Sequence, residues 1–258
     1  MQKPDASIRL TALEGFPMIA PGDDLAAIIL GSLEQNGIRL EAGDVVVLAQ
    51  KIVSKAEGRF VRLADVTPSA RALEIARETR KDGRMVELIL SESKAVIARK
   101  RGVLIVEHRL GYIMANAGID QSNIDHADGQ EYALLLPENP DESCRQLKER
   151  FDAHFGTHVG VLINDSFGRP WRLGVTGVAL GAAGLPSLIS LIGEPDLYGR
   201  SMRVSEIAFA DEIAAAASLI MGQTDAGKPV VHLRGLRWNS PDNAADALIR
   251  PKHQDLFR

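Results

Sequence analysis

Two aspartates, far apart in the chain, are the residues whose types and surroundings most suggest chemistry. Asp165 follows the apolar run "VGVLIN" and precedes Ser166, so a strand would hold its carboxylate beside a polar opening. Asp120 lies in "ANAGIDQSN", a segment of small and polar residues. Mg²⁺ and Mn²⁺ take oxygen ligands from one or two carboxylates and complete their shells with water and phosphate. Two carboxylates reaching one site would clamp two metal ions, or one metal and a phosphate.

Each aspartate also has a structural interpretation that the residues alone leave open. An Asp-Ser pair at a strand end is typical of a turn or a helix cap, and Asp120 is equally typical of a glycine turn with an Asx cap. Ser166 adds a hydroxyl ligand only under the catalytic interpretation. Arg169 and Arg172 suit either a clamp for a phosphate or carboxylate group, or structural ion pairs.

A lysine-containing segment, "QKIVSKAEGR" at residues 50–59, follows an apolar run. In an extended chain, Lys51, Val53 and Lys55 share one face, so two ammonium groups would reach phosphate oxygens together. The sequence GxxxxGK[ST] is absent, so no P-loop is predicted. Ordinary surface lysines are the alternative.

Two loops offer further polar or flat surfaces. The loop "GFPMIAPGDD", residues 15–24, is stiffened by prolines and suits packing against a flat ring. The segment "MGQTDAGKPVV", residues 221–231, exposes Gln223, whose carbonyl oxygen is a candidate cation ligand. Ordinary helix-start and helix-stop signals account for most of both compositions.

Other catalytic arrangements find no support in the sequence. The histidines do not cluster, and Gly156 between His154 and His158 weakens a helical zinc motif. No serine lies in a nucleophile elbow. The single cysteine, Cys144, has no intrachain disulfide partner, which favours a reducing, cytoplasmic setting.

Hydrophobic periodicity predicts the elements that position these residues. Helices are predicted over residues 23–36, 68–81 with Pro68 at the first position, 141 to about 154, and about 203–222, and strands over 44–49, 159–164 and 229–235, with two short strands within 95–118. Small residues at 174–193 indicate close packing. Because strands and helices do not alternate regularly, the pattern predicts an α+β fold with mixed or antiparallel sheets, not a Rossmann or P-loop fold.

Composition places the chain among globular proteins. Its 258 residues are 45% hydrophobic and 25% charged, with a net charge of −4, so nucleic acid is not an expected partner. Neither a signal segment near the start nor a membrane-spanning run is expected. The chain is expected to form one unit over residues 1–258; a division into two intertwined lobes stays open, with the connection near 137–142 the best candidate boundary.

Five segments together resemble a known family. In this order, "GFPMI", "QKIVSKAEGR", "ANAGIDQSN", "NDSFGRPWRLG" and "DLYGRSMRVSEIAFADEIAAAASLIMGQ" are similar to the coenzyme F420-0:L-glutamate γ-glutamyl ligases, over roughly residues 10–235. The resemblance implies an uncommon α+β ligase fold, a homodimer, and GTP-dependent addition of L-glutamate to coenzyme F420-0. It also implies Mg²⁺ or Mn²⁺, with two ions expected, and K⁺ as a helper.

The resemblance also assigns residues. Expected metal ligands are Asp120, Asp165, Ser166 and Gln223, and expected GTP contacts are Phe16, Pro17, Met18, Ile19, Gln50, Lys55, Asn123, Met221, Gly222, Gln223, Thr224, Asp225, Ala226, Gly227 and Lys228. Gln50 stands where a small hydroxyl residue is frequent in the family, and Ser166 where threonine is frequent.

The implied chemistry agrees with the residues themselves. Joining a carboxylate to an amine in water is uphill, so the acid is first activated as an acyl phosphate by the γ-phosphoryl group of GTP. Such a transfer depends on positioning and charge neutralisation, and Asp120, Asp165 and Lys55 are the expected catalytic residues. A metal-dependent nucleotide phosphohydrolase is the alternative, since paired aspartates and a lysine serve that reaction too.

Overall fold

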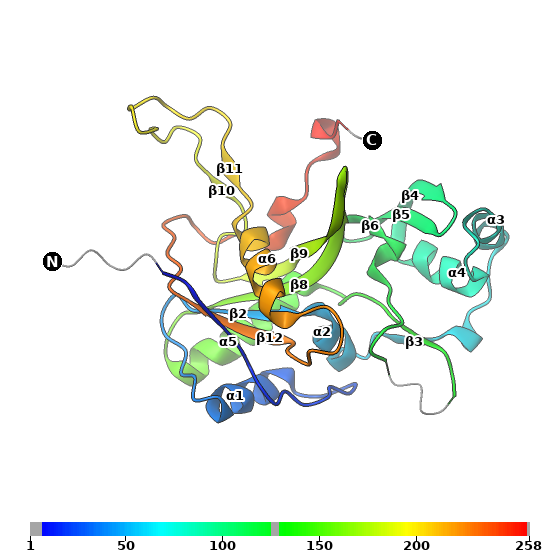
Figure 1. Cartoon of the computed structure of the whole chain (residues 1–258), viewed down its shortest axis with the longest axis horizontal. Helices are drawn as coiled ribbons and strands as arrows, with labels where there is room; N and C mark the ends of the chain where they lie inside the picture. The colour runs from blue at the N-terminus through cyan, green and yellow to red at the C-terminus, as the bar shows by residue number, and fades with distance from the viewer. Residues whose placement is uncertain (1–6, 125–128, 257–258) are drawn as a thin grey trace.

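A five-stranded mixed sheet forms the centre of the molecule (Figure 1). The computed structural model describes residues 7–124 and 129–256; the expected absence of a signal segment rests partly on residues 1–6, which lie outside the described residues. In spatial order the strands are β1 (Arg9–Ala12), β12 (Val230–Arg234), β2 (Val45–Ala49), β8 (Gly160–Arg169) and β9 (Arg172–Ala183). Only β2 and β8 are parallel among these neighbours. The α+β prediction is therefore confirmed, as are the strands predicted at 44–49 and 229–235.

Helices cover both faces of this sheet (Figure 1). One face packs against α1 (Leu25–Gln35), α2 (Gln50–Ala56) and α5 (Pro140–Phe155), and the other against α6 (Phe209–Met221). Strands buried on both faces read as continuous apolar runs rather than alternating ones, which explains "VVVLA" and "GVLIN". The helices predicted at 23–36 and from 141 are confirmed; Asp24 caps α1 by accepting a hydrogen bond from the Ala27 N–H at 3.0 Å.

Two glycines of β9 allow helices to approach the sheet closely. A Cβ atom on Gly177 would lie 2.3 Å from the Ala214 carbonyl oxygen of α6, and one on Gly181 would lie 2.4 Å from the Pro140 carbonyl oxygen of α5. No side chain fits at such distances. The close packing expected for residues 174–193 is confirmed.

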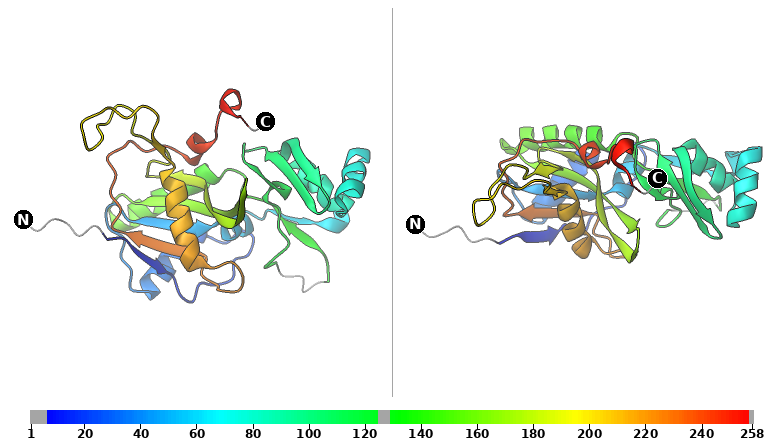
Figure 2. Two further views of the ribbon diagram at one scale, coloured as in Figure 1. Left: turned by 45° about the horizontal axis from the view of Figure 1, so that its top comes forward. Right: turned by 90° about the horizontal axis from the view of Figure 1, so that it is seen from above.

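A smaller lobe stands beside the sheet (Figure 2). It comprises α3 (Ala70–Thr79), α4 (Gly83–Ser91), β4 (Ser93–Lys100), β5 (Val103–His108) and β6 (Ile113–Ala115), with the three strands forming their own antiparallel sheet. This lobe has a separate hydrophobic cluster. The short pair β3 (Phe60–Arg62) and β7 (Tyr132–Leu134) lies between it and the main sheet. Residues 95–118 thus contribute three strands, not two.

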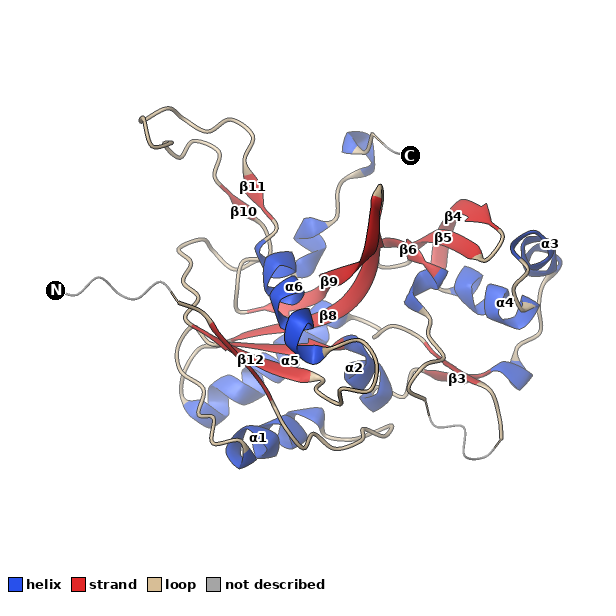
Figure 3. Cartoon of the chain, viewed as in Figure 1, coloured by secondary structure: helices blue, strands red, loops and turns tan. Residues whose placement is uncertain are grey.

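Two hairpins project from the main sheet (Figure 3). One is the outer half of β8 and β9, and the other is β10 (Ile189–Ser190) with β11 (Glu206–Ile207) and their long connection. Short 3₁₀ turns complete the fold at Leu63–Asp65, Asn116–Gly118, Ala245–Leu248 and Lys252–Gln254. Among the described residues, no helix combines the length and apolar character needed to cross a membrane.

Several predicted elements were wrong in detail. Residues 50–56 form helix α2 rather than an extended segment, because Ile52 and Val53 pack into the core directly after β2. The strand predicted over 159–164 continues to Arg169, since it pairs with β9 as a long hairpin.

The helix starts were also misplaced at two positions. Pro68 precedes the cap of α3 instead of opening the helix, because Ser69 accepts the hydrogen bond from the Ala72 N–H. The last long helix begins at Phe209, not near 203, because Ile207 pairs with Ile189 in the projecting hairpin.

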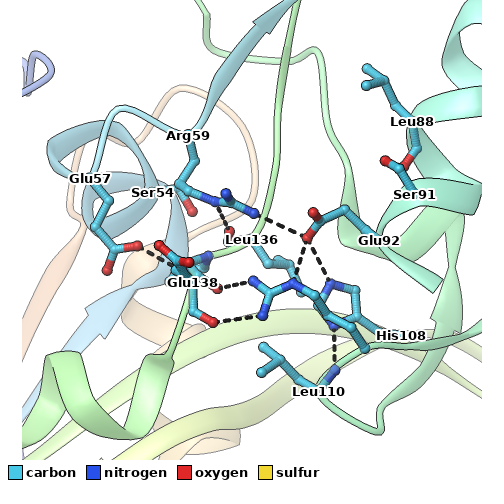
Figure 4. Close-up of polar contacts among 12 residues, drawn as sticks. Ser54, Glu57, Arg59, Leu88, Ser91, Glu92, His108, Leu110, Leu136 and Glu138 are labelled. Carbon is cyan, nitrogen blue, oxygen red and sulfur yellow. Dashed lines mark hydrogen bonds and ion pairs between the residues drawn. The ribbon is translucent and has the colours of Figure 1, made fainter. Parts of the chain in front are cut away.

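Glu92, at the end of α4, anchors the smaller lobe to the rest of the chain. Its Oε2 atom accepts hydrogen bonds from Arg59 Nη2 at 3.1 Å and Arg109 Nε at 3.0 Å, and His108 Nε2 lies 3.5 Å away (Figure 4). Burial opposes its ionisation, but His108, Arg109 and Arg59 outweigh that effect and lower the Glu92 pKa to about 2. Arg59 follows α2 and also donates to the Leu136 carbonyl at 3.0 Å. One carboxylate therefore joins the smaller lobe to the segments at the ends of α2 and β7.

Replacing Glu92 with glutamine is expected to lower the free energy of unfolding by about 2 kcal/mol, because two partly buried arginines lose a charged hydrogen-bond acceptor. Urea titrations at pH 7 measure this. Glu149→Gln is the matched control, since Glu149 is largely exposed and, within the described part of the chain, pairs with Arg145 of its own helix. Equal urea midpoints for the Glu92 variant and the parent would contradict the anchoring role of Glu92.

Candidate functional site

The parallel pairing of β2 with β8 stops at Ala49 and Asn164, and a pocket of about 490 Å³ opens there. Ligand sites in open sheets commonly lie at the carboxyl ends of parallel strands. Helix α2 begins directly after β2, while Asp165 and Ser166 follow the buried part of β8. The pocket is also lined by the loop at 16–19, the turn at 120–123 and the loop at 221–228.

The structure brings to the wall of this one pocket every residue that the family resemblance assigned to the site. They are Phe16, Pro17, Met18, Ile19, Gln50, Lys55, Asp120, Asn123, Asp165, Ser166, Met221, Gly222, Gln223, Thr224, Asp225, Ala226, Gly227 and Lys228. Their proximity follows from the fold, but their individual roles toward metal and nucleotide stay predictions.

The carboxyl group of Asp165 is costly to ionise, because no neighbouring charge in the described part of the chain fully offsets the cost of its burial. Burial raises its pKa to about 6, although the Ser166 N–H and the Lys51 ammonium act in the opposite direction. The described residues provide no cationic side chain within 4.0 Å of this carboxylate. An anion held in this way is suited to a bound cation.

Asp120 is paired, unlike Asp165. Its Oδ2 atom lies 2.6 Å from Lys51 Nζ and accepts the Ser122 hydroxyl at 2.7 Å, while Oδ1 accepts the Ser122 N–H at 2.8 Å. Burial raises the pKa of Asp120, but the contacts with Lys51 and Ser122 exceed this effect and lower it overall. Asp120 is therefore an anion with an ammonium group already in contact.

Lys55 lies one helical turn after Lys51 and faces the same pocket. Its Nζ atom donates to the Asn123 carbonyl at 2.8 Å, and its side chain is buried. Burial, followed by repulsion from Lys51, lowers the Lys55 pKa. Among the described residues, Lys55 has no carboxylate partner, so its ammonium group is suited to a phosphate ligand.

The loop after α6 closes the opposite wall. Ser166 Oγ donates to Gln223 Oε1 at 3.0 Å, so two neutral oxygens lie together at this wall of the pocket. Asn123 Nδ2 donates to the Thr224 carbonyl at 3.3 Å, which connects this loop to the turn that carries Asp120. At the end of the loop, Lys228 pairs with Glu14 at 2.8 Å.

The donor set fits hard divalent cations. It consists of the carboxylates of Asp120 and Asp165, the Ser166 hydroxyl and the Gln223 amide oxygen, all of which are oxygen ligands. Mg²⁺ and Mn²⁺ require few protein carboxylates when phosphate supplies the other ligands. Within residues 7–124 and 129–256 no cluster of three or more histidine, cysteine, aspartate or glutamate side chains offers a competing metal site.

The assignment of site residues from the sequence left out several residues that line the pocket. They are Ala49, Lys51, Ile52, Ser122, Asn164, Ser218 and Pro229. Lys51 and Ser122 lie inside motifs already singled out, so the motif itself was a signal. Asn164 Nδ2 donates to Ser218 Oγ at 3.0 Å, and no sequence pattern announces that contact. Arg169 and Arg172 lie on the exposed part of the hairpin and do not line the pocket.

Comparisons with known proteins agree on one family. Residues 15–235 match the family described as F420-0:Gamma-glutamyl ligase. The chain is 44% identical to the coenzyme F420:L-glutamate ligase of Methanothermobacter thermautotrophicus, over 97% of this chain and 99% of that protein. It is 39% identical to the coenzyme F420:L-glutamate ligase of Archaeoglobus fulgidus, over 97% of this chain and 96% of that protein. Both matches cover the pocket and the smaller lobe.

Proposed function

The chain belongs to the F420-0:gamma-glutamyl ligase family, and we propose that it uses GTP to join L-glutamate to coenzyme F420-0 at the pocket described above. The observation that supports this most is the convergence of Asp120, Asp165 and Lys55, from three separate segments, on one pocket. Further γ-linked glutamates are part of the same proposal. The products are GDP, phosphate and the glutamylated coenzyme.

The proposed reaction has two steps. The carboxylate of the acceptor attacks the γ-phosphorus of GTP, which forms an acyl phosphate and releases GDP. The glutamate amine then attacks the acyl carbon, the phosphate leaves, and the amine proton passes to solvent. Neither step needs a covalent protein nucleophile, so the residues contribute by positioning and charge.

Side chains of the pocket have complementary roles in this proposal. Asp120, Asp165, Ser166 and Gln223 hold Mg²⁺ or Mn²⁺, which supplies charge neutralisation at the phosphates when bound. Lys55 places its ammonium group beside the γ-phosphate. The loop at 16–19 packs against the guanine ring, and the loop at 221–228 encloses the nucleotide from the opposite wall. K⁺ is retained as a proposed helper ion.

A homodimer is also part of the proposal. Both projecting hairpins expose large apolar side chains. Monomeric proteins rarely expose large contiguous apolar patches. These side chains are Trp171, Leu173, Val175, Ile192, Leu197, Tyr198 and Val204.

The ligase proposal is tested by measuring GDP release with each substrate omitted in turn. Release is expected to require both the deazaflavin acceptor and divalent cation, and ligated product is expected only when glutamate is added. A metal-dependent nucleotide phosphohydrolase, which the comparisons do not favour, would release GDP at the same rate without acceptor and glutamate. That outcome would reject the ligase proposal.

A further inference from the structure

Lys51 lines the pocket and pairs with one of its aspartates, Asp120. Its ammonium group lies 2.6 Å from Asp120 Oδ2, and the Ser122 hydroxyl donates to the same oxygen at 2.7 Å. Lys51 also donates to Ser122 Oγ at 2.7 Å. The Asp120 oxygen that faces Lys51 therefore has both of its lone-pair directions engaged.

A divalent cation and the Lys51 ammonium group cannot both hold this oxygen. Each needs the same lone pair at a distance of about 2 to 3 Å, and their positive charges repel at that separation. Cation binding at Asp120 Oδ2 therefore requires Lys51 to leave this oxygen. The departure has a cost unless the ammonium group finds another anion.

Phosphate oxygens are the anion that the fold makes available to Lys51. Lys51 and Lys55 are separated by one turn of α2, so they lie on the same face of the helix and point into the same pocket. The Lys55 ammonium is held by the Asn123 carbonyl at 2.8 Å, while the Lys51 side chain is 28% exposed and makes its polar contacts, among the described residues, with the turn at 120–122. A nucleotide phosphate next to Lys55 lies within reach of both lysines.

We propose that Lys51 is a displaceable counter-ion that couples cation binding to nucleotide binding. Without nucleotide, Lys51 holds Asp120 and opposes the cation. With nucleotide, the phosphates draw Lys51 away and Asp120 becomes a cation ligand. This inference rests on the proposed function, since it assigns a role in the same site.

The coupling is reciprocal. If nucleotide increases cation affinity by a given factor, the cation increases nucleotide affinity by the same factor. Coupling factors between sites are typically about 5- to 150-fold. Lys51 is expected to supply about tenfold of the total, in addition to the direct contact between cation and phosphate.

The test measures Mn²⁺ binding from the electron paramagnetic resonance signal of free Mn²⁺, first without nucleotide and then with a non-hydrolysable GTP analogue. Lys51→Gln is expected to bind Mn²⁺ alone about five- to tenfold more tightly than the parent, because the competing charge is gone. The same variant is expected to bind the analogue more weakly, so the coupling factor falls about tenfold. Lys51→Arg keeps the charge and is expected to retain the weak Mn²⁺ binding of the parent.

The outcomes separate this inference from the proposed function. Lys51→Gln with Mn²⁺ affinity equal to or lower than that of the parent overturns the counter-ion role, because a lysine that merely supports the fold weakens the site when removed. Lys51→Met repeats the comparison if the glutamine variant folds poorly. If the parent binds no GTP analogue, the proposed function fails, whereas the comparison of Mn²⁺ affinities without nucleotide still decides the competition at Asp120.

Discussion

Replacing Asp165 with asparagine is expected to slow ligation severely and, at the same time, to stabilise the folded protein at neutral pH. Activity should fall by on the order of a hundred- to a thousandfold, the loss that follows removal of one electrostatic group from a preorganised site. Stability should rise because the carboxylate is costly to ionise in its place: burial raises its pKa from 3.8 to about 6. The two effects of one substitution therefore have opposite signs.

The pH dependence follows from this shift. A carboxyl group whose pKa is raised in the folded state costs no stability below pH 4, and the cost grows as the pH rises through 6. At pH 7 the cost is at most about 3 kcal/mol, and solvent in the pocket reduces it. In metal-free buffer, the Tm of Asp165→Asn should match that of the parent near pH 4 and exceed it at pH 7. A lower Tm at pH 7 would show that Asp165 stabilises the fold instead.

Replacing Asp44 with asparagine is expected to destabilise the folded protein, in contrast to the same change at Asp165. Asp44 precedes β2 at the far end of the sheet from the pocket, and only 2% of its side chain is exposed. Arg234 contacts it through Nε at 2.9 Å and Nη2 at 2.6 Å, and His232 Nε2 lies 2.8 Å from Oδ2. Removing one partner from a buried ion pair costs about 3 to 5 kcal/mol, so Asp44→Asn should unfold at markedly lower urea concentration.

The stabilising effect of Asp44 should depend on acidity. Burial raises the Asp44 pKa, but His232 and Arg234 overcome this and lower it to about 2. A lowered pKa means that the stabilisation is complete above pH 4 and is lost as the pH falls through 2. Urea midpoints of parent and Asp44→Asn should therefore differ most at neutral pH and converge near pH 2. A constant difference across this range would show that the ion pair is not the cause.

The elements that could be predicted from the sequence are those whose signal is local. The apolar run that forms β2 and the Asp24 and Asn36 caps of α1 are local signals. Helix α2 was missed because "QKIV" fits a strand face and a helix face equally well, and packing of Ile52 and Val53 on distant strands decided between them. Pairing of Ile207 with Ile189 likewise shortened α6.

The site was predicted from motif order and not from geometry. Residue types suggested a role for Asp120 and Asp165, but nothing in their spacing indicates that the turn after β6 lies beside the middle of β8. The parallel pairing of β2 with β8 and the anchor at Glu92 bring the segments together. The contact between Lys51 and Asp120 depends on this arrangement, so it could be found only in the structure.

The most direct test of whether GTP activates the acceptor carboxylate is to follow one carboxylate oxygen into the released phosphate. Coenzyme F420-0 with an ¹⁸O-labelled acceptor carboxylate is incubated with GTP, L-glutamate and Mg²⁺, and the released phosphate is analysed by mass spectrometry. An acyl phosphate requires one carboxylate oxygen to leave with the phosphate, so phosphate carrying one ¹⁸O atom and a glutamylated product are predicted in equal amounts. Phosphate without ¹⁸O, formed alongside the same product, would contradict activation of the carboxylate by GTP at this pocket.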